Sequence, residues 1–244
     1  MGIVIAVTSG KGGTGKTSVT GGVAAALGRM GRSVLCIDMD IGLRNLDISL
    51  GMSDRALMDF TDAAQGSCPL ERAAVSHPAL PGLSLLTAPL TLPEDLAPAQ
   101  VGELLRQARA RYQYVLIDSP AGLGAGFRLA TAYADRAIVV ATNDASSLRD
   151  AQRTVTELAH LEQVHLVMNR IQPKLLKKLK ATIDDAMDAA GLPLLGVLPE
   201  DPRVMLAANL GKPLTPGGRP GAAEACANIA RRLEGQHVPI MRIR

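Results

Sequence analysis

Short, almost uninterrupted apolar runs alternate along the chain with longer stretches of helical spacing. The runs are four or five residues long and lack alternating polar positions, which is the pattern of parallel strands buried on both faces. They lie at residues 3–7, 33–37, 83–86, 114–117, 137–141, 164–168 and 194–198. The stretches between them predict helices at residues 17–30, 99–111, 146–161, 173–190 and 221–233.

This order of strands and helices predicts an α/β fold with a single doubly wound, mostly parallel sheet flanked by helices. The connections are long enough for crossovers between parallel strands. Proline and glycine cluster at residues 68–98 and 213–221, which we interpret as a surface excursion between strands and a loop before the last helix. We expect residues 1–234 to form one domain and residues 235–244 a C-terminal tail.

Composition narrows the classes of function. The chain has 244 residues, 47% of them hydrophobic, so a full core is expected, but only 2% are aromatic. Such a surface offers few stacking platforms for single-stranded nucleic acid. The net charge of +3 does not by itself predict binding to DNA or anionic lipid.

Cysteine spacing and apolar run lengths indicate the compartment. Cys36, Cys68 and Cys226 are far apart and form no CxxC pair, which argues against a zinc ribbon or a redox dithiol and suits a reducing cytosol. The first apolar run is too short for a signal peptide, and no run reaches the roughly 18 residues of a spanning helix. We expect a cytoplasmic protein.

A glycine-rich loop follows the first predicted strand and precedes the first predicted helix. It consists of Gly10, Lys11, Gly12, Gly13, Thr14, Gly15, Lys16 and Thr17. This is the phosphate-binding pattern G-x-x-x-x-G-K-[ST] in its required context, where backbone N–H groups surround phosphate oxygens at a helix N-terminus. We expect Lys16 to neutralise the β- and γ-phosphates, Thr17 to hold Mg²⁺, and Ser18 to contact the nucleotide.

A second lysine, Lys11, opens the loop. With it the loop resembles the deviant Walker A family of ATPases, K-G-G-x-G-K-[ST], which includes MinD, ParA and the nitrogenase iron protein. The resemblance implies ATP and Mg²⁺ as ligands and an ATP-dependent homodimer, in which Lys11 reaches the phosphates of the partner. It implies slow, dimerisation-dependent hydrolysis of ATP to ADP and phosphate, with Lys11 and Lys16 as catalytic residues.

Two carboxylates follow the second predicted strand, at the end that faces a nucleotide crevice in such sheets. We expect Asp40 to position the attacking water and Asp38 to contact Mg²⁺ or its waters. Residues 38–47 read D-M-D-I-G-L-R-N-L-D. This segment is more similar to the MinD branch of the family than to ParA or the iron protein.

The run at residues 114–117 leads into D-S-P-A-G, which begins at Asp118. An aspartate after an apolar strand with a glycine four residues later is the Walker B and switch II arrangement, although a lone aspartate there also suits a helix cap. We expect Asp118 to hold Mg²⁺ through water and the Gly122 N–H to sense the γ-phosphate. The segment again resembles the MinD branch.

The resemblance also implies where the base binds. Asn169 follows the run at residues 164–168, and Pro199, Glu200 and Asp201 follow the last run. In the family these positions frame adenine. A structural alternative remains open for Glu200 and Asp201, which could cap a helix beginning near Pro202.

The MinD branch implies a role in cell-division site placement, with a MinC-like inhibitor and a MinE-like stimulator as partners and no nucleic acid. The alternative is a ParA-like or flagellar-number (FlhG-type) positioning ATPase that binds DNA or a protein cargo. Its basic patch would draw on the four lysines of residues 174–180. A scaffold that holds ATP without hydrolysing it is a third interpretation. The cysteine positions argue against the bridged cluster of the iron protein.

The tail at residues 235–244 mixes apolar and basic residues, as a membrane-surface segment does. Pro239 interrupts it, and a helix of the five residues that follow would be marginal. Two interpretations stay open: a membrane or partner segment, peripheral at the inner face of the cell membrane, or an edge strand formed by residues 240–244.

Overall fold

The structure is a computed structural model that describes residues 1–53 and 55–243. Its described residues form one eight-stranded sheet in the order β3-β4-β2-β5-β1-β6-β7-β8. Every pairing is parallel except that of β3 with β4. The strands are β1 (Ile3–Thr8), β2 (Val34–Asp38), β3 (Val75–Ser76), β4 (Leu83–Leu86), β5 (Tyr114–Asp118), β6 (Arg136–Ala141), β7 (Gln163–Ile171) and β8 (Leu194–Pro199).

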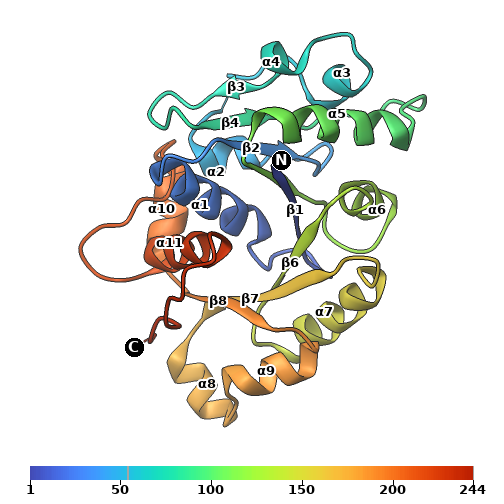
Figure 1. The fold of residues 1–244 in the computed structure, drawn as a ribbon. Coiled ribbons are helices and arrows are strands. Elements are labelled where there is room, and N and C mark those ends of the chain that lie inside the picture. The colour runs from blue at the N-terminus through green and yellow to red at the C-terminus, as the bar shows by residue number, and fades with distance from the viewer. Residues whose placement is uncertain (54, 244) are drawn as a thin grey trace.

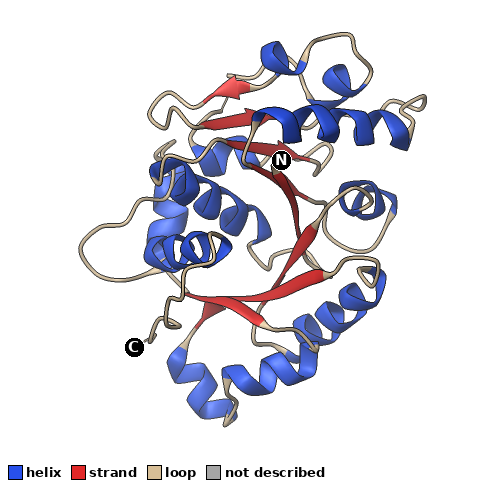
Figure 2. Cartoon of the chain, in the orientation of Figure 1, coloured by secondary structure: helices blue, strands red, loops and turns tan. Residues whose placement is uncertain are grey.

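Helices cover both faces of this sheet (Figures 1 and 2). They are α1 (Lys16–Arg29), α2 (Leu46–Leu50), α3 (Phe60–Ala64), α4 (Leu70–Ala73), α5 (Pro98–Arg111), α6 (Ala125–Thr131), α7 (Ala145–Glu157), α8 (Pro173–Leu179), α9 (Ile183–Ala190), α10 (Pro202–Asn209) and α11 (Ala222–Leu233). The predicted α/β fold with a doubly wound, mostly parallel sheet is therefore confirmed.

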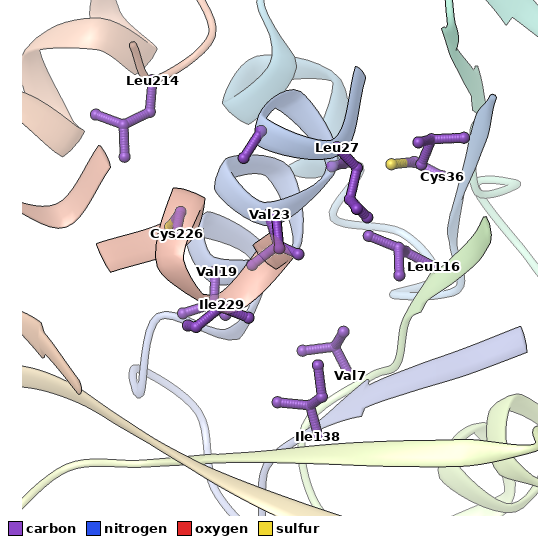
Figure 3. Packing of buried hydrophobic residues seen from close by; sticks show 14 of the residues in the cluster. Val7, Val19, Val23, Leu27, Cys36, Leu116, Ile138, Leu214, Cys226 and Ile229 are labelled. Carbon is purple, nitrogen blue, oxygen red and sulfur yellow. The ribbon is translucent and has the colours of Figure 1, made fainter. Parts of the chain in front are cut away.

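The core is built almost entirely from aliphatic side chains. On one face, α1 and α11 pack on the sheet through residues such as Val23, Leu27 and Ile229 (Figure 3). On the other face, two clusters lie under α3, α4 and α5 and under α6, α7 and α9. Alternate residues of the central strands point to opposite faces, so Val4 and Ile5 belong to different clusters. This explains the uninterrupted apolar runs of the sequence.

Two expectations about elements are corrected. The single helix predicted at residues 173–190 is two helices, because Lys180 is left-handed (φ 50°) and Thr182 caps α9 by accepting from the Asp185 N–H at 3.1 Å. Residues 68–98 are more than a surface excursion, since besides the predicted strand at residues 83–86, which is the fully buried β4, they contribute α4 and the edge strand β3.

The tail forms neither helix nor strand in its described residues, 235–243. The edge strand suggested for residues 240–244 is therefore not found, and Arg244 lies outside the described residues. The Arg232 guanidinium instead holds the tail on the domain by donating to the carbonyls of Val238 (2.8 and 3.0 Å) and Pro239 (2.8 Å). It also donates to the Leu195 carbonyl of β8 at 2.7 Å.

None of the helices within residues 1–53 and 55–243 has both the length and the apolar content needed to cross a membrane.

Candidate functional site

The carboxyl ends of β1, β2 and β5 meet at one edge of the sheet, and the predicted site residues gather there. Asp118 at the end of β5 lies in register with Asp38 on β2 and with Val7 on β1. The glycine-rich loop leaves β1 directly beside them and enters α1 at Lys16. Topology alone thus brings together segments more than 100 residues apart.

The loop has a conformation that requires glycine. Gly13 and Gly15 have φ values of 81° and 83°, in the left-handed region that other residues rarely adopt. A Cβ at Gly15 would also lie 2.3 Å from Asn169 Nδ2. The Thr14 hydroxyl is buried and has no hydrogen-bond partner among the described residues. This cradle, with an unpaired buried hydroxyl inside it, fits a phosphate chain.

Lys16, Thr17 and Asp118 form a compact polar cluster below the loop. Lys16 Nζ donates to Asp118 Oδ1 at 2.9 Å, and the Thr17 hydroxyl donates to Oδ2 at 2.7 Å. The Thr20 hydroxyl, one turn further along α1, donates to Oδ1 at 3.2 Å. Burial raises the pKa of Asp118, while Lys16 and the two hydroxyls oppose that rise. Cation, hydroxyl and carboxylate are the groups that binding of a magnesium–phosphate complex requires.

Asp38 is buried next to Asp118 and is committed to the backbone. It accepts from the Asp40 N–H at 2.9 Å and from the Leu46 N–H at 3.1 Å, so it fixes the loop between β2 and α2. Burial, and then the charge of Asp118, raise the pKa of Asp38 to about 7. Asp40 is half-buried in the same loop. The catalytic role of Asp40 and the magnesium role of Asp38 stay predictions.

Lys11 is bound within its own chain. Its Nζ donates to Asp144 Oδ1 at 2.8 Å and to the Ser146 hydroxyl at 2.9 Å, both at the start of α7. Partial burial disfavours the charge of Asp144, but hydrogen bonds from Lys11, Ser146 and Thr142 hold its pKa below the usual range. The Lys11–Asp144 pair is a third to a half exposed, so its net contribution to stability is small. Contact of Lys11 with a partner chain stays a prediction.

Gly122, the glycine predicted to belong to switch II, contacts the residue that precedes the phosphate loop. Gly122 has a φ of 83°, and its N–H donates to the Ser9 carbonyl at 3.2 Å. The N–H expected to sense a γ-phosphate is thus adjacent to the loop, where a small shift would redirect it.

A cavity of about 550 Å³ opens beside the phosphate loop and α10, and it contains all four residues predicted to frame the base. Asn169 Nδ2 donates to the Thr14 carbonyl at 2.8 Å. Asp201 caps α10 by accepting from the Arg203 N–H at 3.0 Å, as in the structural alternative. Glu200 pairs with Arg170 at 2.7 Å rather than capping. Pro199 and Ser18 complete this part of the lining.

Four residues at the site were not predicted from the sequence. Thr20 could have been predicted, because it lies four residues after Lys16 on the same face of α1. Asp144, Ser146 and Arg170 had none, since their contacts with the loop span 133, 135 and 157 residues.

The described residues hold no group of three or more histidine, cysteine, aspartate or glutamate side chains arranged for a metal ion. The Thr17 hydroxyl and the Asp118 carboxylate are nonetheless hard oxygen donors of the kind that Mg²⁺ prefers. Mg²⁺ usually takes few protein ligands and shares phosphate oxygens and waters, so this small donor set fits it.

Comparison with known proteins agrees with this geometry. The model of the CobQ/CobB/MinD/ParA nucleotide-binding domain matches residues 5–214. The septum site-determining protein MinD of Synechocystis is 40% identical over 98% of this chain and 91% of its own length. A chain of the MinC:MinD cell division protein complex of Aquifex aeolicus superposes with a TM-score of 0.88 at 34% identity, covering 98% of both chains. MinD of Pyrococcus horikoshii complexed with Mg-ADP gives 0.79 at 30% identity, covering 96% of both. The chain belongs to the MinD/ParA family of nucleotide-binding ATPase domains, and within that family it is similar to MinD.

Proposed function

We propose that this chain is an ATP-gated, dimerising ATPase that acts in cell-division site placement. The observation that carries the proposal is the cluster of Lys16, Thr17 and Asp118 beneath a glycine-rich cradle, with Lys11 at its rim. Lys16 would exchange the Asp118 carboxylate for β- and γ-phosphate oxygens. Mg²⁺, held by Thr17 and through water by Asp118 and Asp38, would neutralise phosphate charge. Asp40 would orient the attacking water.

The position of Lys11 supports a dimer-dependent switch. Its ion pair with Asp144 is partly exposed, so exchanging this carboxylate for the phosphates of a partner costs little. Each protomer would then complete the site of the other, as an arginine finger does. Hydrolysis would be slow and would depend on dimerisation.

The proposed partners follow from the relatives. The solved Aquifex aeolicus structure is a MinC:MinD complex, which supports a MinC-like inhibitor as a partner of the ATP-bound dimer. We assign stimulation of hydrolysis to a MinE-like protein. The proposed location is the cytoplasm and the inner face of the cell membrane. Sedimentation with liposomes in ATP and in ADP, using the full chain and one ending at Leu233, tests whether the tail contributes to membrane binding.

An ATPase assay with two lysine variants tests the proposed mechanism. Lys16→Ala should weaken ATP binding by at least about tenfold, because it removes the buried cation of the loop. Lys11→Ala should keep ATP binding and lose at least about tenfold in turnover, because it removes the cation supplied in trans. Lys178→Ala, on the exposed surface of α8, is the matched control and should behave as wild type. Activity that persists in both loop variants would sink the proposal.

The base pocket predicts selectivity for adenine. Because Asn169 Nδ2 is committed to the Thr14 carbonyl, Oδ1 is the amide atom left to accept from an exocyclic amino group. ATP should therefore bind at least about tenfold more tightly than ITP, which carries a keto oxygen at that position. Asn169→Leu should bring the two dissociation constants, measured by calorimetry, within about twofold of each other. An unchanged ratio would assign the selectivity to other residues of the pocket.

The ParA-like alternative draws on one observation, the lysines of α8 and Lys180, all of which are exposed. A ParA family ATPase from Chlorobium tepidum superposes with a TM-score of 0.80 but is 21% identical, which shows a shared fold alone. Salt-sensitive retention of DNA in the presence of ATP would favour this alternative. Absence of retention at low salt would dispose of it.

A further inference from the structure

The guanidinium of Arg170 joins three segments beside the site. Arg170 lies near the end of β7, and its Nε donates to Glu200 Oε2 at 2.7 Å in the loop after β8. A second nitrogen donates to Glu200 Oε1 at 3.4 Å. The third donates to the carbonyl of Gly13 in the phosphate loop at 3.3 Å. One side chain therefore connects the wall of the base cavity to the phosphate cradle.

The phosphate loop needs such contacts for a geometric reason. A loop that directs its N–H groups inward to an anion directs several carbonyls outward, and those carbonyls require donors. Asn169 supplies one to Thr14 at 2.8 Å, and Arg170 supplies one to Gly13. Two consecutive residues of β7 thus hold two consecutive carbonyls of the loop.

Consecutive residues of a regular strand point to opposite faces, so this double contact needs an irregular backbone. The pairing of β7 with β8 shifts register between Met168 and Ile171. Within that interval Arg170 has a φ of 56°, a left-handed conformation that arginine rarely adopts. The irregularity allows Asn169 and Arg170 to reach the same loop. Strained residues of this kind concentrate at functional sites.

The exposure of the pair argues that stability is not its main contribution. The side chains of Arg170 and Glu200 are 53% and 39% exposed, and ion pairs at such positions contribute little to folding. We propose that Arg170 is a positioning residue that braces the phosphate loop from Glu200, through the Gly13 carbonyl, and so tightens phosphate binding. This inference rests on the proposed ATP binding but goes beyond it, because it assigns the effect to the phosphates and not to the base.

Tripolyphosphate separates these two possibilities, because it lacks the base. We expect Arg170→Ala to weaken binding of Mg-tripolyphosphate and of Mg-ATP by the same factor, about tenfold in calorimetry. Arg170→Lys should weaken both as well, since an ammonium cannot span Glu200 and Gly13 as a planar fork does. Arg106→Ala, which removes another exposed arginine–glutamate pair on α5, should leave both affinities unchanged. The melting temperatures of the Arg170 variants should stay close to that of wild type.

Two outcomes would overturn the proposal that Arg170 positions the phosphate loop. Tripolyphosphate affinity within twofold of wild type, with ATP affinity reduced, would make Arg170 a contact of the base. Unchanged affinities for both ligands in both variants would make the pair a surface ion pair. If the wild-type chain bound neither ligand, the proposed function would fall, and this inference with it.

Discussion

At the scale of single residues, the buried imidazole of His77 shows how one proton can matter to the fold. Its Nε2 lies 3.0 Å from the Leu50 carbonyl, and its Nδ1 accepts from the Ala79 N–H at 3.0 Å. The ring must therefore be neutral with the hydrogen on Nε2, because protonating Nδ1 would break the second bond. Burial, followed by the charges of Arg55 and Arg29, lowers the pKa of His77 below 6.5, against the opposing bond to Leu50.

This lowered pKa predicts acid sensitivity. Below pH 6.5 the unfolded chain binds a proton at His77 that the folded chain does not, so the contribution of His77 is complete above pH 6.5 and declines as the pH falls. The slope is at most about 1.4 kcal/mol per pH unit. The difference between wild type and His77→Gln in the free energy of unfolding should therefore shrink between pH 7.5 and pH 5.5. Urea titrations measure it, with His237→Gln on the exposed tail as control. A constant difference would contradict the prediction.

The residues of the site differ in whether the sequence could predict them, and the difference depends on how far apart in the chain the contacting residues lie. Lys16 and Thr17 come from a local pattern, and Asp38 and Asp118 come from the rule that parallel strands end at one edge. The structure brings these side chains together as that rule predicts. The sequence could not predict that Asp144 binds Lys11, because no spacing links residues 133 positions apart.

At the scale of elements, the length of a helix or strand determines whether the sequence could predict it. All seven predicted strands are present, and the helices at α1, α5, α7 and α11 lie close to their predicted bounds. The two-residue β3 and the four- to seven-residue helices α2, α3, α4 and α6 were missed. A helix of one or two turns shows too few positions for a period of 3.6 to emerge. The break between α8 and α9 was missed because a left-handed lysine has no sequence signal comparable to glycine.

The contact between α11 and β8 depends on a missing side chain. A Cβ at Gly196 would lie 2.4 Å from Cγ1 of the fully buried Ile229. Gly196→Ala should therefore destabilise the fold by about 1–3 kcal/mol in urea unfolding, through overpacking. Gly217→Ala is the matched control, because nothing lies within 4 Å of its Cβ position, and it should stay within about 0.5 kcal/mol of wild type.

Ile229→Ala provides the internal check on this contact. It removes the overlapping atoms, so its cost should be smaller in the Gly196→Ala background than in wild type. Equal costs in the two backgrounds would show that the close approach is relieved elsewhere.

At the scale of the whole molecule, the described residues of the tail contact the hydrophobic clusters on both faces of the sheet. Within residues 1–53 and 55–243, Met241 packs against the cluster around α1 and α11, and Ile243 packs against the cluster around α7 and α9. The composition of the tail indicated a surface segment but not the part of the chain that it contacts. Arg232 determines this contact, because its hydrogen bonds join the tail to β8.

A double-mutant cycle can measure how much the contacts between Arg232 and the tail contribute to the free energy of unfolding. Arg232→Ala should lower the free energy of unfolding by about 1–3 kcal/mol, because it leaves the carbonyls of Leu195, Val238 and Pro239 without this donor. In a chain ending at Gln236 the same substitution should cost less, since only the Leu195 contact remains to be lost. Arg231→Ala, which removes a partly exposed pair with Glu224 and a hydrogen bond to Asn228 Oδ1 but no contact with the tail, is the control and should cost the same in the full and shortened chains. Equal costs of Arg232→Ala in the full and shortened chains would mean that Arg232 acts on β8 alone and that the tail is held by its apolar contacts.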